Sequence, residues 1–266
     1  MMSKPIIVGH RANTFRAIHR YLKLGVPVLE FDVKRKDNKL ILMHGMIGEP
    51  ASLTESLLLE LHYILCSGDS IVKHVTLEEA LDIINGKAGV WLDIKDRGIE
   101  SDIVKVIDKV NFKGPIYASS KYHAVVRNLK KAMPEIIGAI TLNEQPVDPI
   151  TLVKRANADM VSIEHTCVDR EFIEILHKNS IGVAVWTVNQ ISEAEKLISM
   201  GVDVIITDKP DIILKALGKR IPKSNTPFFQ SILLLLTSII VLIYCLYGVS
   251  DLESVVGYYS FCDEPY

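Results

Sequence analysis

The chain has 266 residues, a formal net charge of −2 at pH 7 and 23% charged residues. This length fits one α/β barrel or two modest domains, and it is too great for a small disulfide scaffold. The near-neutral charge gives no electrostatic basis for a nucleic-acid partner. The cysteines show no paired spacing, which indicates free thiols in a reducing compartment; they are Cys66, Cys167, Cys245 and Cys262.

Short apolar runs rich in β-branched residues alternate with amphipathic segments along residues 1–220. The apolar runs predict strands at residues 6–9, 28–33, 90–94, 116–119, 137–141, 160–164, 183–187 and 204–207. The segments with apolar positions three and four apart predict helices at residues 12–23, 77–85, 99–110, 122–132, 149–156, 170–178, 192–199 and 211–217. Eight strand–helix units in this length predict a parallel TIM (β/α)8 barrel.

One apolar run, residues 40–44, lies outside this alternation. It follows KRKDNK, in which Asp37 and Asn38 suit a tight turn. We therefore expect residues 29–33 and 40–44 to form a β-hairpin that extends beyond the barrel, at the rim that carries the chemistry.

The end of the chain carries its longest apolar stretch. Residues 224–250 contain no charged residue, and FFQSILLLLTSIIVLIYCLY (228–247) has about the 20 residues that cross a bilayer. We expect a linker with two prolines at residues 221–227, a transmembrane helix at 228–248 and a short acidic tail at 249–266.

The basic residues around this stretch predict its orientation. No Lys or Arg follows it, and four precede it: Lys215, Lys219, Arg220 and Lys223. The positive-inside rule then predicts a single-pass protein of the cell membrane with its barrel in the cytoplasm. The first residues, MMSKPIIVGHR, lack the apolar core of a signal peptide, so we expect no secretory leader.

Acidic residues gather where the first strands end, and in a TIM barrel the chemistry lies at the C-terminal ends of the strands. Glu30 and Asp32 are two positions apart, so both side chains point to one face of a strand. They repel each other unless a cation lies between them, and Asp93 at the end of the next barrel strand can supply a third carboxylate. Three carboxylates without Cys favour one hard divalent cation, Mg²⁺ or Ca²⁺.

Two histidines and two cations lie beside these carboxylates. His10 follows the first strand and His44 ends the hairpin; with an ordinary pKa of roughly 6.5, one can accept a proton while the other donates one. Arg11 and Lys95 suit the oxygens of a phosphate group. The set points to metal-assisted cleavage of a phosphodiester.

Other strand-end residues have less specific interpretations. Trp91 is expected to pack in the core, and Asp208 is expected to cap the last helix. Ser119 and Ser120 fit either the barrel lining or a substrate contact. Trp186 fits either the core or a substrate wall.

The stretches around these residues resemble the glycerophosphodiester phosphodiesterase family from about residue 6 to residue 211. They are VGHR, GVPVLEFDV, LILMH, VTLEEAL, WLDIK, VWTVN and GVDVIITDKPD. The resemblance implies hydrolysis of glycerophosphodiesters to an alcohol and sn-glycerol 3-phosphate. It also implies roles for particular residues: His10 and His44 as the acid–base pair, Glu30, Asp32 and Asp93 as metal ligands, Arg11 and Lys95 on the phosphate, and Trp186 near the substrate.

Three features of the first half differ from that family's usual pattern. HRANTF is shorter than the usual loop and keeps only Asn13 and Thr14 of a Pro-Glu-Asn-Thr stretch; Asp93 replaces a Glu; and Gly45 follows His44 where the family usually has Asp. These features resemble the sphingomyelinase D-like phospholipase D group, whose members release a cyclic phosphate. The second half resembles the phosphodiesterases, and the cysteines of the toxin-type loops are absent, so a phosphodiesterase is the first choice.

Two alternatives follow from the same residues. The first is a membrane-tethered phospholipase D-type or lysophospholipase D enzyme that acts on lipid diesters such as a lysophospholipid. The second is a catalytically silent barrel that binds a phosphate ligand or a partner; the His10 and His44 pair argues against it, since binding needs no acid and base. The sequence assigns neither the oligomeric state nor which histidine is the acid.

Overall fold

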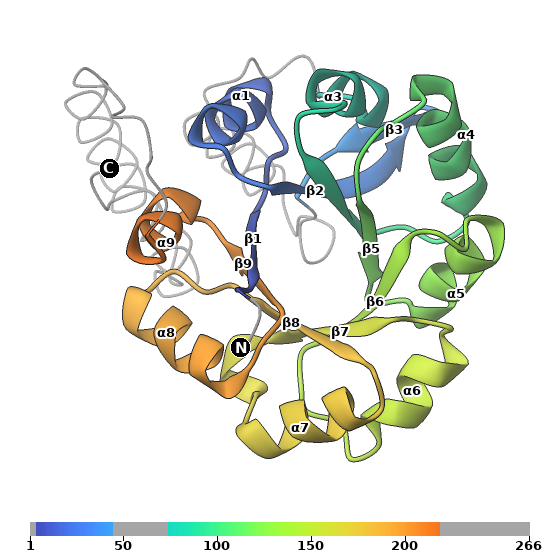
Figure 1. The fold of residues 1–266 in the computed structure, drawn as a ribbon. Coiled ribbons are helices and arrows are strands. Elements are labelled where there is room, and N and C mark those ends of the chain that lie inside the picture. The colour runs from blue at the N-terminus through green and yellow to red at the C-terminus, as the bar shows by residue number, and fades with distance from the viewer. Residues whose placement is uncertain (1–3, 45–73, 219–266) are drawn as a thin grey trace, which may run out of the picture. The chain divides into compact units, whose positions relative to one another are not determined.

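The described part of the chain, residues 4–44 and 74–218 of a computed structural model, is an eight-stranded parallel barrel (Figure 1). Its strands are β1 (Ile6–Gly9), β2 (Val28–Lys36), β4 (Gly89–Ile94), β5 (Ile116–Ser120), β6 (Ile137–Leu142), β7 (Met160–Glu164), β8 (Gly182–Trp186) and β9 (Val204–Thr207). Each pairs with the next, and β1 pairs with both β9 and β2, which closes the barrel. The predicted TIM barrel is confirmed.

Helices form a ring outside the strands (Figure 1). They are α1 (Phe15–Leu24), α3 (Leu77–Ile84), α4 (Glu100–Val110), α5 (His123–Ala132), α6 (Pro149–Arg155), α7 (Arg170–Lys178), α8 (Ile191–Met200) and α9 (Pro210–Ala216). Each helix buries apolar residues, and the apolar core between helices and strands is continuous around the barrel. The predicted segments differ from these only at their ends; α1, for example, begins at Phe15 because the Thr14 side chain caps it by accepting from the Ala17 N–H at 3.1 Å.

The predicted hairpin is also present. Strand β3 (Lys39–Leu42) runs antiparallel to the end of β2, with Val33 opposite Leu42. Asp37 and Asn38 form the two-residue turn, and both have the positive φ that such a turn requires (48° and 60°). β2 continues to Lys36, three residues further than predicted, because the hairpin pairs these residues.

A second, smaller apolar cluster fills the inside of the barrel. It consists of Val8, Val28, Trp91, Tyr117, Ala139, Met160, Ala184, Val204 and Ile206, with Trp186 packed against it. Trp91 is 1% exposed and stacks on Tyr117 with ring centroids 5.2 Å apart, which confirms it as a core residue. Side chains alternate along a strand, so the inward direction of Val28 also sends Glu30 and Asp32 inward, toward the C-terminal mouth of the barrel.

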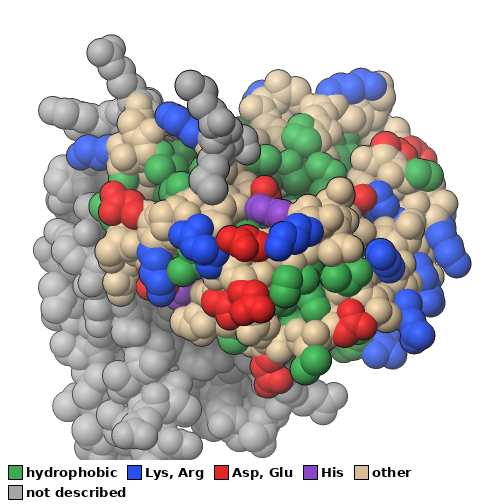
Figure 2. All heavy atoms as spheres, turned by 60° about the horizontal axis from the view of Figure 1, so that its bottom comes forward, with side chains coloured by type: hydrophobic (Ala, Val, Ile, Leu, Met, Phe, Trp, Pro, Cys, Tyr) green, Lys and Arg blue, Asp and Glu red, His purple; other side chains and the backbone are tan. Residues whose placement is uncertain are grey.

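Among the helices of residues 4–44 and 74–218, none combines the length with the apolar composition that a membrane span needs. The predicted linker (221–227), transmembrane helix (228–248) and tail (249–266) lie outside the described residues. On the face shown in Figure 2, acidic and basic side chains are interspersed and hydrophobic side chains form small separate patches. This mixture agrees with the small net charge of the chain.

Candidate active site

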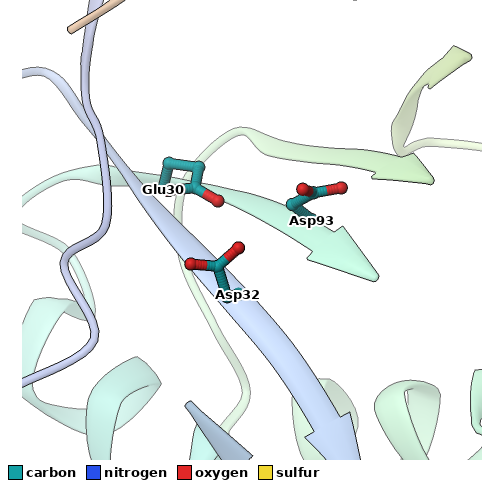
Figure 3. A group of neighbouring side chains, drawn as sticks. All are labelled: Glu30, Asp32 and Asp93. Atoms are coloured by element: carbon teal, nitrogen blue, oxygen red, sulfur yellow. The ribbon is translucent and has the colours of Figure 1, made fainter. Parts of the chain in front are cut away.

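Three carboxylates meet at the C-terminal mouth of the barrel (Figure 3). Glu30 and Asp32 come from β2 and Asp93 from β4, and Asp32 lies directly opposite Asp93 in the strand pairing. Each residue offers an oxygen within 4.8 Å of those of the other two. The sequence prediction that these carboxylates form one group is therefore confirmed as geometry.

Asp32 is held by contacts on both oxygens. It is 1% exposed, and its Oδ2 accepts from Asn13 Nδ2 at 2.7 Å and lies 3.1 Å from His44 Nδ1. Its Oδ1 forms an ion pair with Lys95 Nζ at 2.7 Å. Burial alone would raise the pKa of Asp32, but the His44 hydrogen bond and the Lys95 charge outweigh it and hold the pKa well below its usual range. These partners therefore favour the ionised form of Asp32.

Glu30 has fewer compensating partners. It is 2% exposed, and its Oε2 accepts from the backbone N–H of Arg11 at 2.6 Å. Arg11 has φ +53°, a left-handed conformation that turns this N–H toward the carboxylate. Burial, followed by the charge of Asp32, raises the pKa of Glu30 to about 8.

Asp93 is oriented by residues at the inner wall of the barrel. Ser119, which is 2% exposed, donates from Oγ to Asp93 Oδ1 at 3.1 Å and accepts from Trp91 Nε1 at 2.9 Å. Ser119 thus supports Asp93 from the inner wall of the barrel. Ser120 is equally structural, since its Oγ donates to the Ile94 carbonyl at 2.7 Å and accepts from the Tyr122 N–H at 3.1 Å.

Lys95 lies among the carboxylates, beside which the sequence places it. Its Nζ contacts both Asp32 and Asp93. Burial would lower the pKa of Lys95, but the charges of Asp93 and Asp32 outweigh it and raise the pKa above its usual range. The Lys95 side chain is still 25% exposed, so the ammonium group lies at the edge of the site.

The arrangement fits a divalent cation. Three carboxylates converge at the mouth, and burial followed by the charge of Asp32 raises the pKa of Glu30, so that a cation bound among them would stabilise its ionised form. Oxygen donors alone suit Mg²⁺ or Ca²⁺ better than a metal that prefers sulfur or imidazole. Glu30, Asp32 and Asp93 are the residues that would hold it.

His10 lies on the β1 and β9 side of this group. Its Nδ1 is 2.8 Å from Asp208 Oδ1, and its side chain is 12% exposed. Burial would lower the pKa of His10, but the carboxylates of Asp208 and Glu30 outweigh it and raise the pKa. The prediction that Asp208 caps the last helix is wrong: α9 begins at Pro210, Lys209 occupies the capping position, and the Asp208 carboxylate turns to His10 instead.

The other predicted residues take less enclosed positions. His44 is 41% exposed and touches the carboxylate group only through Asp32. The side chain of Arg11 is exposed, and its charge helps to hold the pKa of Asp208 well below its usual range, after the larger influence of His10. Trp186 packs against the inner cluster, and its Nε1 is buried without a hydrogen-bond partner among the described residues.

Four residues support the site in ways that the sequence did not predict: Asn13, Ser119, Asn189 and Asp208. The sequence did point to Asn13, because it is one of the two residues of the family's usual stretch that the shortened first loop retains. Asn13 holds both the carboxylate and the backbone of Asp32, since Asn13 Oδ1 also accepts from the Asp32 backbone N–H at 2.9 Å. The sequence pointed to Asn189 as well, because it ends the VWTVN stretch that resembles the family. Its Nδ2 donates to Asp208 Oδ2 at 2.9 Å.

Comparisons with known proteins identify the family of the chain. The model of the "Glycerophosphoryl diester phosphodiesterase family" matches residues 72–212, which is just over half of the chain. A glycerophosphodiester phosphodiesterase of Caldanaerobacter subterraneus is 27% identical over 240 residues, covering 81% of this chain and 99% of that protein. One from Bacillus altitudinis is 25% identical over 223 residues, covering 76% and 91%.

Solved structures share the fold. A phosphodiesterase of Oleispira antarctica, in complex with the product sn-glycerol-3-phosphate, superposes with a TM-score of 0.68 at 20% identity, covering 81% of this chain and 97% of that one. A glycerophosphodiester phosphodiesterase of Agrobacterium tumefaciens gives 0.60 at 18% identity, covering 80% and 100%. With the family match and the geometry of the mouth together, the chain belongs to the glycerophosphoryl diester phosphodiesterase family of enzymes.

Proposed function

We propose that this protein hydrolyses glycerophosphodiesters to an alcohol and sn-glycerol 3-phosphate, with His10 and His44 as its acid and base. One observation carries the proposal: three carboxylates have oxygens within 4.8 Å of one another, and two histidines share this mouth, His44 with its Nδ1 on Asp32 and His10 with its Nδ1 on Asp208. The names of the related proteins, and the product bound by the Oleispira antarctica enzyme, support the choice of substrate.

Each residue then has a distinct task. A divalent cation held by Glu30, Asp32 and Asp93 would supply positive charge to the phosphate oxygens. Arg11 and Lys95 bind the same phosphate group, and Lys95 lies beside two of those carboxylates already. Trp186 forms a wall for the substrate.

The two histidines handle the protons. Both ring Nδ1 atoms face carboxylates, which leaves the Nε2 atoms for proton exchange with the substrate. One histidine removes a proton from the attacking oxygen, and the other protonates the alcohol that leaves. The attacking oxygen is that of water, or of the glycerol hydroxyl beside the phosphate if a cyclic intermediate forms and is then opened by water.

The test is phosphorus NMR on the full-length chain in mild detergent with Mg²⁺ or Ca²⁺. Glycerophosphocholine and a lysophospholipid are offered separately, and we expect glycerol 3-phosphate from the first. A cyclic phosphate or lysophosphatidate from the second, with no reaction of the first, would instead assign the protein to phospholipase D-type chemistry. Absence of product from either, in folded protein supplied with the cation, would favour a barrel that only binds phosphate.

We also propose that residues 228–248 anchor the enzyme in the cell membrane with the barrel in the cytoplasm. The support is in the sequence: an uncharged stretch long enough to span, and basic residues on its N-terminal side alone. On this proposal residues 1–220 are the catalytic domain, residues 221–227 the linker and residues 249–266 an external tail.

A further inference from the structure

A chain of hydrogen bonds runs from His10 into the end of β9. His10 Nδ1 lies 2.8 Å from Asp208 Oδ1, and the other oxygen, Asp208 Oδ2, accepts from Asn189 Nδ2 at 2.9 Å. Asn189 in turn uses its Oδ1 to accept from the Asp208 backbone N–H at 3.0 Å and from Thr207 Oγ1 at 3.1 Å. Tyr21 of α1 donates its hydroxyl to the His10 carbonyl at 3.0 Å. These residues lie beside the carboxylates that would hold a cation but are not among them.

The backbone N–H of Asp208 determines which atom donates and which accepts in each of these hydrogen bonds. A backbone N–H can only donate, so the amide of Asn189 must present its oxygen to Asp208 N and its nitrogen to the Asp208 carboxylate. The carboxylate can only accept, because the pKa of Asp208 is held well below its usual range. His10 Nδ1 must therefore carry a hydrogen.

We infer that Asp208 and Asn189 are positioning residues that hold His10 as the Nδ1–H tautomer, with Nε2 free for the substrate. The inference rests on the proposed function for the purpose of Nε2, but the hydrogen-bond geometry stands without it. A ring held in this way presents the same nitrogen in every turnover, whereas an unsupported imidazole divides between two tautomers and several rotations. Neither residue touches the substrate on this view; both act through His10.

The same logic predicts what Asp208→Asn does. Asn189 still presents N–H groups to position 208, so the new amide must turn its oxygen toward Asn189 and its NH₂ toward His10. His10 Nδ1 must then accept, which places the ring hydrogen on Nε2 and removes the free nitrogen. The reciprocal pair of changes, Asp208→Asn with Asn189→Asp, reverses this. The carboxylate introduced at position 189 accepts from the amide introduced at position 208, and the oxygen of that amide again faces His10 Nδ1.

The experiment compares four full-length proteins: the unaltered chain, Asp208→Asn, the reciprocal double variant and Asp203→Asn. Asp203 is a matched control, because its Oδ2 lies 2.9 Å from His177 Nε2 at the opposite end of β9, far from the mouth. Histidine ¹⁵N NMR at alkaline pH, where the rings are neutral, reads the tautomer of His10, and a His10→Gln variant assigns its signal. Steady-state kinetics with glycerophosphocholine give kcat and KM.

We expect the Nδ1–H signature of His10 in the unaltered chain, in the control and in the double variant, and the Nε2–H signature in Asp208→Asn. kcat should fall by about 10²- to 10⁴-fold in Asp208→Asn with a smaller change in KM, and the double variant should recover at least about tenfold of it. A Nδ1–H signature in Asp208→Asn with kcat within about threefold of the unaltered chain would overturn the inference. So would a double variant that keeps the Nε2–H form, or a control that loses as much activity. If the unaltered chain cleaves no glycerophosphodiester, the proposed function fails, while the tautomer spectra still decide the positioning role.

Discussion

Glu30 is buried beside two other carboxylates, and its ionisation costs free energy in the folded protein. Its pKa rises from an unfolded value near 4.5 to about 8. Between these pH values the folded protein holds a proton that the unfolded chain releases, so the free energy of unfolding falls as pH rises through this range. A cation bound among the carboxylates opposes this loss because it stabilises the ionised form.

Replacement of Glu30 by Gln should therefore separate folding from cation binding. Gln is uncharged and can still accept from the Arg11 N–H. Without added metal, we expect Tm of the unaltered chain to fall between about pH 5 and 8 more steeply than Tm of Glu30→Gln. With Mg²⁺ or Ca²⁺ at pH 8, Tm of the unaltered chain should rise and that of the variant much less. Glu78→Gln on the exposed side of α3 is the control, and equal pH slopes in all three proteins would contradict the prediction.

The two histidines should differ in what their loss does to stability. His10→Ala leaves the Asp208 carboxylate, which is 21% exposed, without its ring partner and should cost about 1–3 kcal/mol. His44 is 41% exposed, and Asp32 keeps Asn13 and Lys95 when the ring is removed, so His44→Ala should cost no more than about 0.5 kcal/mol.

Turnover should nevertheless fall by at least about 10²-fold in both variants. Urea denaturation and phosphorus NMR on the same preparations measure the two effects, and His19→Ala on the exposed side of α1 should change neither. Retention of most activity by either His10→Ala or His44→Ala would remove that histidine from the acid–base pair.

Among the elements, β1 and α1 are packed too closely for any side chain at Gly9. A Cβ there would lie 2.5 Å from Tyr21 Cδ2, and the Tyr21 hydroxyl holds the His10 carbonyl. We expect Gly9→Ala to cost about 1–3 kcal/mol, measured by urea denaturation, and to lower kcat because the displaced ring carries His10 with it. Gly182→Ala in β8 is the comparison: its Cβ would come no closer than 3.1 Å, to the flexible end of Met160, and should cost less. Equal losses in both would show that the Tyr21 contact has no special effect.

The elements were predictable because their signals are local. Apolar periodicity marks strands and helices, and the turn at Asp37 and Asn38 marks the hairpin. The grouping of Glu30 with Asp93 was predictable too, since parallel strands bring their C-terminal ends to one mouth. The hydrogen-bond partners of the site residues were not predictable, because they depend on which strands pair and in what register. His10 and Asp208 are 198 positions apart, and the sequence around Asp208 reads equally well as a helix cap.

At the scale of the whole molecule, the site occupies one arc of the barrel mouth. Its residues come from the strands, or from the loops that follow them, in the order β8, β9, β1, β2, β4 and β5, which is their order in the closed sheet. The arc exists only because β1 pairs with β9, where Gly9 lies opposite Thr207, the residue before Asp208. Closure of the barrel thus joins the two ends of the domain into one site. The family model matches residues 72–212, whereas His10 and His44 precede this range. Closure of the barrel brings these two histidines to the same mouth as the strands inside the matched range.

The orientation of the whole chain in a membrane gives the last prediction. Protease added outside intact cells that express the protein should remove only the tail beyond Gly248 and leave the barrel whole, because Lys and Arg precede the apolar stretch and none follow it. A variant with Lys219, Arg220 and Lys223 changed to Glu, and with lysines in place of Asp251 and Glu253, should lose this preference and leave part of the barrels open to digestion. Immunoblots against tags at the two ends of the chain measure the digestion of the unaltered protein and of the variant. Digestion of the barrel in the unaltered chain would reverse the assignment, and a barrel found entirely in the soluble fraction would show that residues 228–248 do not anchor it.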